Sequence, residues 1–152
     1  MQKKSLPKYY IIESTNICNF QCSICPNSLS RKMEKGNISL ELYDKLLNQI
    51  SNVAEGVQLY WLGEPLLNPD IFELINRCKR KTNAKVMLST NGSLLTEQII
   101  QSLIDSGLDE LIISVDACEC QDVYSSIRVG GDINKLNSNI EMLFRKNKRI
   151  KV

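Results

Sequence analysis

The apolar residues of this chain follow two alternating patterns. Short apolar runs rich in β-branched and aromatic residues, each the length of one buried strand, occupy positions 9–14, 57–62, 85–90 and 108–116. Between and after these runs, apolar residues recur at three- and four-residue spacing, the period of a helix with one buried face. This alternation predicts βαβ units and hence a parallel sheet with right-handed crossovers.

Capping residues indicate where the helices begin. Ser39 and Thr96 have side chains that can cap a helix, and Asn68 precedes Pro69, which suits a first helical position. We therefore expect an open parallel sheet of four or five strands with helices on one convex face. The final residues, 149–152, have the pattern of a fifth strand that is just beginning. The predicted helices cover 39–49, 68 to at least 78, 96–107 and 133–145.

The composition narrows the class of protein. The chain has 152 residues, about one domain, of which 43% are hydrophobic and 24% are charged. A net charge of +2 gives no indication of nucleic-acid binding. No apolar run approaches the roughly 18 residues of a membrane helix, and positions 1–15 lack the features of a secretory signal. We expect a cytoplasmic protein with neither a membrane nor a nucleic-acid partner.

Polar motifs follow every predicted strand. The segment CNFQCSICP comes after the first strand, GEP after the second and TNG after the third, while SVD closes the fourth and SIRVGGD lies beyond it. The carboxyl ends of parallel strands share one face of a sheet or barrel, and that face carries the active site. Stability does not require such loops to converge, so we expect them to share a ligand.

The six cysteines, in a chain without histidine, leave three interpretations open. A structural zinc site needs a fourth ligand besides the three clustered cysteines. The dithiol spacing C-S-I-C could serve redox chemistry, but it leaves the first cysteine of the cluster without a role. An iron–sulfur cluster prefers thiolates, and one loop can hold three of its corners while the fourth iron stays open to a small molecule.

The other three cysteines are weak candidates for a fourth ligand. Cys78 falls on the apolar stripe of a predicted helix and is expected to be a small core residue. Cys118 and Cys120 follow the fourth strand on the functional face, where they could complete a metal site. We interpret them as inert loop thiols.

The pattern C-x3-C-x2-C after the first strand resembles the signature of the radical S-adenosylmethionine (SAM) enzymes. The resemblance extends through GEP, TNG, SVD and the IR-x-GG loop, from Tyr10 onward, and the finer pattern resembles the branch with a C-terminal auxiliary-cluster domain of the SPASM type. It implies a partial (β/α) barrel with an open parallel sheet of about four βα units plus the start of a fifth strand. The chain is then one core domain over 1–152, truncated at its C-terminal end relative to the family and without a second domain.

The resemblance also implies the site. Cys18, Cys22 and Cys25 would ligate a [4Fe–4S] cluster, with their sulfurs gathered near the GEP and SVD motifs. The GEP motif would meet the SAM amino group, a cation that suits a carboxylate, and an arginine can grip the methionine carboxylate through two hydrogen bonds. Ser114 is a second candidate for the carboxylate. The implied SAM-binding residues are Ile24, Gly63, Glu64, Pro65, Asn91, Ser114 and Arg128.

For three residues of the loops at the strand ends, purely structural interpretations stay open. Arg128 could form a surface ion pair, Glu64 could cap the helix that follows it, and Asp116 could cap the segment after the fourth strand.

The family's reaction implies a function. An electron from a flavodoxin- or ferredoxin-type reductant would cleave SAM to methionine and a 5′-deoxyadenosyl radical, which abstracts hydrogen from an unidentified substrate. We assign no side chain a catalytic role. The alternative is a catalytically incomplete Fe–S and SAM-binding module that needs a partner chain to complete the barrel.

Overall fold

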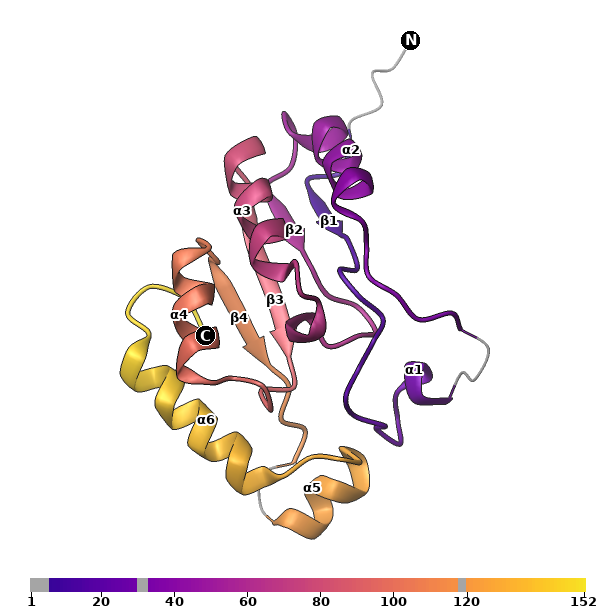
Figure 1. Ribbon diagram of the computed structural model, residues 1–152, viewed down its shortest axis with the longest axis vertical. Coiled ribbons are helices and arrows are strands. Elements are labelled where there is room, and N and C mark those ends of the chain that lie inside the picture. Colours follow the sequence, from indigo (N-terminus) through magenta and orange to yellow (C-terminus); the bar gives the residue numbers. More distant parts are fainter. Residues whose placement is uncertain (1–5, 30–32, 118–119) are drawn as a thin grey trace.

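A four-stranded parallel sheet lies at the centre of the computed structural model, which describes residues 6–29, 33–117 and 120–152 (Figure 1). Neighbouring strands pair in parallel in sequence order, as predicted. Lys151 forms a parallel bridge with Glu110, so the expected fifth strand begins beside the fourth. The strands are β1 (Tyr9–Ile11), β2 (Gly56–Gln58), β3 (Lys85–Thr90) and β4 (Glu110–Ile113).

The helices that cover the sheet are close to those predicted. Ser39 and Thr96 cap α2 and α4, since each side-chain oxygen accepts a backbone N–H of the first turn. Gly107, with φ of 84°, follows the end of α4, because a residue without Cβ adopts this conformation at little cost. The helices over the sheet are α2 (Leu40–Ile50), α3 (Ile71–Lys81), α4 (Glu97–Asp105) and α6 (Ile133–Lys146).

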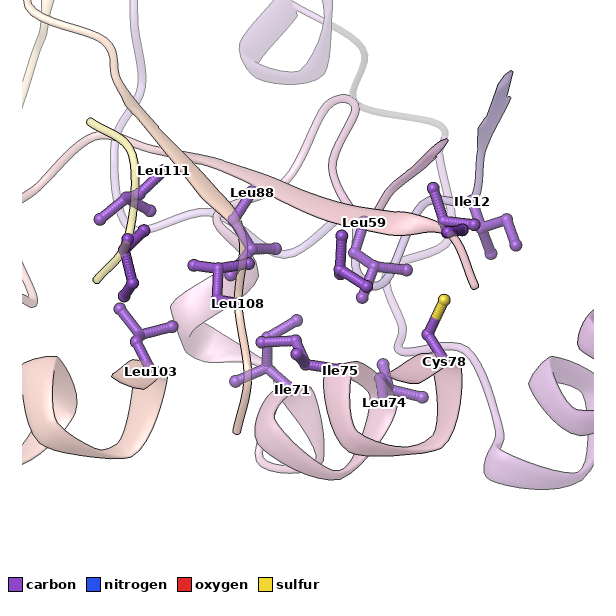
Figure 2. Close-up of a cluster of buried hydrophobic side chains, with 14 of the residues drawn as sticks. Ile12, Leu59, Ile71, Leu74, Ile75, Cys78, Leu88, Leu103, Leu108 and Leu111 are labelled. Carbon is purple, nitrogen blue, oxygen red and sulfur yellow. The ribbon is translucent and has the colours of Figure 1, made fainter. Parts of the chain in front are cut away.

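The core lies between one face of the sheet and these helices. Figure 2 shows Leu59, Leu88 and Leu111 opposite side chains of α3 and α4, and the same buried cluster includes residues of α2 and α6. Cys78 is fully buried in this cluster and is a core residue, as expected. On the other face, Tyr9 and Ile112 are 64% and 40% exposed. The sheet therefore has helices on one face and is open on the other.

The structure corrects the start of the second predicted helix. A 3-10 helix, η1 (Pro65–Leu67), comes first, and α3 starts only at Ile71. Asn68 is buried: its amide donates to the backbone oxygen of Ser14, and its oxygen accepts the N–H of Asp70. Because its side chain connects the loops after β1 and β2, Asn68 does not cap α3.

Three strands are shorter than the apolar runs that predicted them. β1, β2 and β4 end before positions 14, 62 and 116, because the polar motifs leave the ladder to form loops. Two short helices were not predicted, α1 (Pro26–Leu29) and α5 (Gln121–Ile127). In α5 only Tyr124 is buried, which is too little apolar periodicity to identify a helix from sequence. Within the described residues, no helix has the length and apolar character needed to cross a membrane.

Candidate functional site

A cavity of about 280 Å³ opens at the carboxyl ends of the strands. It is lined by the loops after all four strands, by the end of β3 and by Arg128, which follows α5. Pro65, which begins η1, is buried and is not among the lining residues. The remaining predicted site residues all line the cavity: Cys18, Cys22, Ile24, Cys25, Gly63, Glu64, Asn91, Ser114 and Arg128.

The cysteine loop is held by backbone contacts with a distant segment. The N–H of Gln21 donates to the oxygen of Val129 at 2.9 Å, and the N–H of Ser23 donates to the oxygen of Ile127 at 3.0 Å. Both acceptors lie at or beyond the end of α5. The helix that the sequence did not predict therefore positions the loop that carries the three thiols.

The three thiols of this loop differ in exposure. Cys22 is buried, while Cys18 and Cys25 are partly exposed, and all three are free. Burial raises the pKa of the Cys18 thiol, so ligation as a thiolate requires a metal charge to compensate. Among the described residues, no three His, Cys, Asp or Glu side chains converge on a point that could hold one metal ion. In a cubane each cysteine binds a different iron, so a cluster site does not need such convergence.

The other cysteines lie outside this group. Cys78 is in the core and Cys120 is exposed at the start of α5, while Cys118 lies outside the described residues. No fourth thiolate joins the loop from the part of the chain that the structure describes.

Glu64 is a buried carboxylate that joins two strand ends. One oxygen accepts the hydroxyl of Thr90 at 2.7 Å and the N–H of Leu66 at 3.2 Å. The other accepts the N–H of Asn91 at 2.8 Å. The carboxylate thus caps η1 and also lines the cavity, so the capping role does not remove it from the cavity wall.

Burial raises the pKa of Glu64 above its ordinary value of 4.5, against the opposing effect of its three hydrogen bonds. Between the ordinary and the raised pKa, the folded protein binds a proton that the unfolded chain has lost, so stability falls as the pH rises through this window. We expect Glu64→Gln to remove this part of the pH dependence. Urea unfolding of the metal-free protein from about pH 4 to about pH 7 measures it. Parallel pH profiles for the two proteins would contradict the expectation.

A network of side-chain amides links the cysteine loop to the end of β3. Asn91 donates from its amide to the side-chain oxygen of Asn19, and Asn19 donates in turn to the hydroxyl of Ser93, each at 2.9 Å. The oxygen of Asn91 accepts from the hydroxyl and the N–H of Ser93. Because both ends of its amide are engaged, Asn91 has a clear structural role at the position predicted to face a ligand.

Ser114 makes hydrogen bonds with residues of β3, whereas Ile24 is largely exposed. The hydroxyls of Ser114 and Ser89 are 3.2 Å apart, and the N–H of Ser114 donates to the oxygen of Thr90. Ile24 lines the cavity and is 69% exposed.

Arg128 forms an ion pair, but not a surface one. Its Nε is 2.5 Å from Oδ2 of Asp116, and its side chain is only 15% exposed. Its Nη1 is 3.9 Å from the sulfur of Cys22. Asp116 also lines the cavity, and Cys120 rather than Asp116 stands at the N-cap position of α5. The sequence analysis placed Asp116 in the SVD motif at the strand end but did not include it among the SAM-binding residues.

Comparison with known proteins matches residues 12–152 to the radical SAM superfamily. The AdoMet-dependent heme synthase of Methanosarcina barkeri is 26% identical over 90% of this chain and 39% of its own length. The S-adenosyl-L-methionine-dependent 2-deoxy-scyllo-inosamine dehydrogenase of Niallia circulans is 35% identical over 70% of this chain and 44% of its own.

Among solved structures, that of BtrN in complex with AdoMet and 2-DOIA superposes with a TM-score of 0.69 at 27% identity. The match covers 88% of this chain and 56% of BtrN. This chain therefore spans less than half the length of the two curated relatives and just over half of BtrN.

Proposed function

Because this chain belongs to the radical SAM superfamily, whose members use a [4Fe–4S] cluster and SAM, we propose that Cys18, Cys22 and Cys25 bind the cluster and that the adjoining cavity binds SAM. The observation that carries the proposal is the composition of that cavity. Three thiols of one loop, a buried carboxylate and a guanidinium line one space at the strand ends. When bound, the cluster would supply the electron that cleaves SAM and so produces the radical that removes hydrogen from a substrate.

The residues around the thiols suit the amino-acid part of SAM. Glu64 offers negative charge for an ammonium group, and Arg128 offers a planar fork of donors for a carboxylate. Ser114 adds a hydroxyl donor. A zwitterion fits such a pair of charges, and its ammonium would favour the ionised form of Glu64.

The other predicted SAM-binding residues would contact the rest of SAM or approach its amino-acid part through the backbone. Ile24 would pack on the adenine, Asn91 would approach the ribose or the carboxylate, and the backbone at Gly63 would meet the ammonium. Pro65 would act through the backbone, since it begins η1 behind the cavity wall.

Membership of the family supports the type of reaction, while the substrate is left open. Two of the relatives are named as a SAM-dependent dehydrogenase and a heme synthase. We infer hydrogen abstraction from a substrate that enters beside SAM, with electrons from a flavodoxin- or ferredoxin-type donor.

A second candidate is a cluster- and SAM-binding module that becomes an enzyme only with a partner chain. The open face of the sheet favours it, with Tyr9, Ile11 and Ile112 exposed where a closed barrel would bury side chains. Radical chemistry needs a cavity that excludes water.

The test is anaerobic reconstitution of the 152-residue chain with iron and sulfide, followed by SAM and dithionite. We expect cluster formation, SAM binding and slow cleavage of SAM to 5′-deoxyadenosine without substrate turnover, because one side of the cavity is open to water. Chromatography of 5′-deoxyadenosine measures the rate. Stoichiometric zinc with no iron uptake would refute the proposed function. Fast, substrate-coupled cleavage by the chain alone would instead refute the module interpretation.

A further inference from the structure

The loop after β4 contains a backbone conformation that requires an explanation. Asp116 has φ of 65°, and across residues 6–29, 33–117 and 120–152 it is the one non-glycine residue with positive φ. Aspartate tolerates this left-handed conformation better than most residues, but at a cost in free energy. Such a conformation persists where the surroundings hold it, and these positions cluster at functional sites.

Among the residues that the structure describes, Arg128 is the ion-pair partner of the Asp116 side chain. Its Oδ2 is 2.5 Å from Nε of Arg128, and both residues line the cavity. The two side chains are 35% and 15% exposed. Salt screens a partly buried pair much less than a solvated one, so this contact can fix the position of a side chain.

The backbone holds Arg128 at the end of α5 and in the turn after it. Its N–H donates to the oxygen of Tyr124 at 2.7 Å, and its oxygen accepts the N–H of Gly131 at 2.8 Å. A Cβ at Gly131 would lie 2.5 Å from the ring of Tyr124, so this turn requires glycine. The backbone of Arg128 is thus fixed, which leaves its long side chain as the mobile part.

The guanidinium has five N–H donors in a rigid plane. Nε lies 2.5 Å from Oδ2 of Asp116 in the ion pair, and Nη1 lies 3.9 Å from the sulfur of Cys22 at the cysteine loop. The ion pair therefore holds the guanidinium at the cavity wall between the loop after β4 and the cysteines. In this position it retains donors for an anionic ligand.

We propose that Asp116 is a positioning residue, which holds the guanidinium of Arg128 where it receives the carboxylate of SAM. This inference rests on the proposed function, because it takes SAM as the ligand. Without the Asp116 carboxylate, the arginine side chain would have to be ordered at the moment of binding, and affinity would fall. The backbone strain at Asp116 is then explained by its side chain, which must point toward Arg128.

The test compares two ligands on the reconstituted 152-residue chain. SAM carries the amino-acid carboxylate, whereas 5′-methylthioadenosine has the same adenosine without it. We expect Asp116→Asn, which keeps the tolerance for positive φ, to weaken SAM binding by about tenfold and to change 5′-methylthioadenosine binding by less than about twofold. Isothermal titration calorimetry measures both affinities.

Three further variants separate positioning from general damage. Asp116→Gly relieves the backbone strain while removing the carboxylate, so it should fold at least as stably and lose the same SAM affinity. In an Arg128→Lys background, Asp116→Asn should have little further effect, since a double-mutant cycle reports dependence between two residues. Glu97→Gln, which removes an exposed ion pair with Lys146, is the control and should bind both ligands normally.

The possible outcomes are distinguishable. SAM-selective loss with non-additive variants supports the inference. Wild-type protein that forms its cluster but binds no SAM would overturn the proposed function and this inference with it. Normal SAM affinity in Asp116→Asn, equal loss of both ligands, or additive effects in the cycle would overturn the positioning role alone.

Discussion

Replacement of Cys18, Cys22 or Cys25 by alanine is expected to abolish iron–sulfur reconstitution. A cubane with one open iron has three protein ligands, and no other described cysteine lines the cavity. Loss of one thiolate therefore leaves two iron corners without a protein ligand. Iron and sulfide per chain, together with the visible absorption of the reconstituted protein, measure the effect.

The matched control is Cys120→Ala, because Cys120 is exposed and outside the cavity. It should reconstitute like the wild type, and circular dichroism should show all four variants folded. Full iron content in any of the three loop variants would contradict the assignment of the ligands. Loss of iron in Cys120→Ala would also contradict it, and would indicate a ligand from the loop before α5.

Gly63→Ala is expected to destabilise the fold by about 3 kcal/mol or more. A Cβ at this position would lie 2.1 Å from the backbone oxygen of Thr15 and 2.9 Å from the Cα of Asn16. Both obstacles are backbone, so no side-chain rotation relieves them. The N–H of Glu64 also donates to the oxygen of Ile17, so the chain would separate next to Cys18. Urea denaturation measures the change.

Gly36→Ala is the matched control for this substitution. Nothing lies within 4 Å of a Cβ at Gly36, which is exposed, so its effect should stay within about 0.5 kcal/mol. A Gly63→Ala protein as stable as the wild type would show that the two loops separate easily. The close approach of the loops after β1 and β2 would then have no energetic significance.

The sequence was sufficient to predict the parallel sheet, because burial follows the printed alternation of residues. In β3 the predicted range is also the observed one, and Val86, Leu88 and Thr90 are buried while the residues between them are partly exposed. The other strands were predicted too long because apolar character continues past the last ladder hydrogen bonds. Leu59 is fully buried beyond the end of β2, for example.

The candidate site was predictable as a set of loops but not as a set of contacts. Strand order placed the motifs at one end of the sheet, and their side chains line one cavity. The partners of Asp116 and Asn68 depend on loops that meet only in the folded chain, so neither role follows from local propensity. Helix α5 was missed for the same reason, since it packs on α6 with little apolar periodicity of its own.

The hydrogen bonds between the cysteine loop and residues 127–129 can form only after both segments have been synthesised. Ser23 and its acceptor Ile127 are 104 positions apart, so the cysteine loop leaves the ribosome well before this backbone anchor is synthesised. A nascent chain that ends before Ile127 lacks the backbone hydrogen bonds of Gln21 and Ser23, which flank Cys22. We therefore expect cluster delivery to follow rather than accompany translation of this domain, with the thiols open to oxidation in the interval.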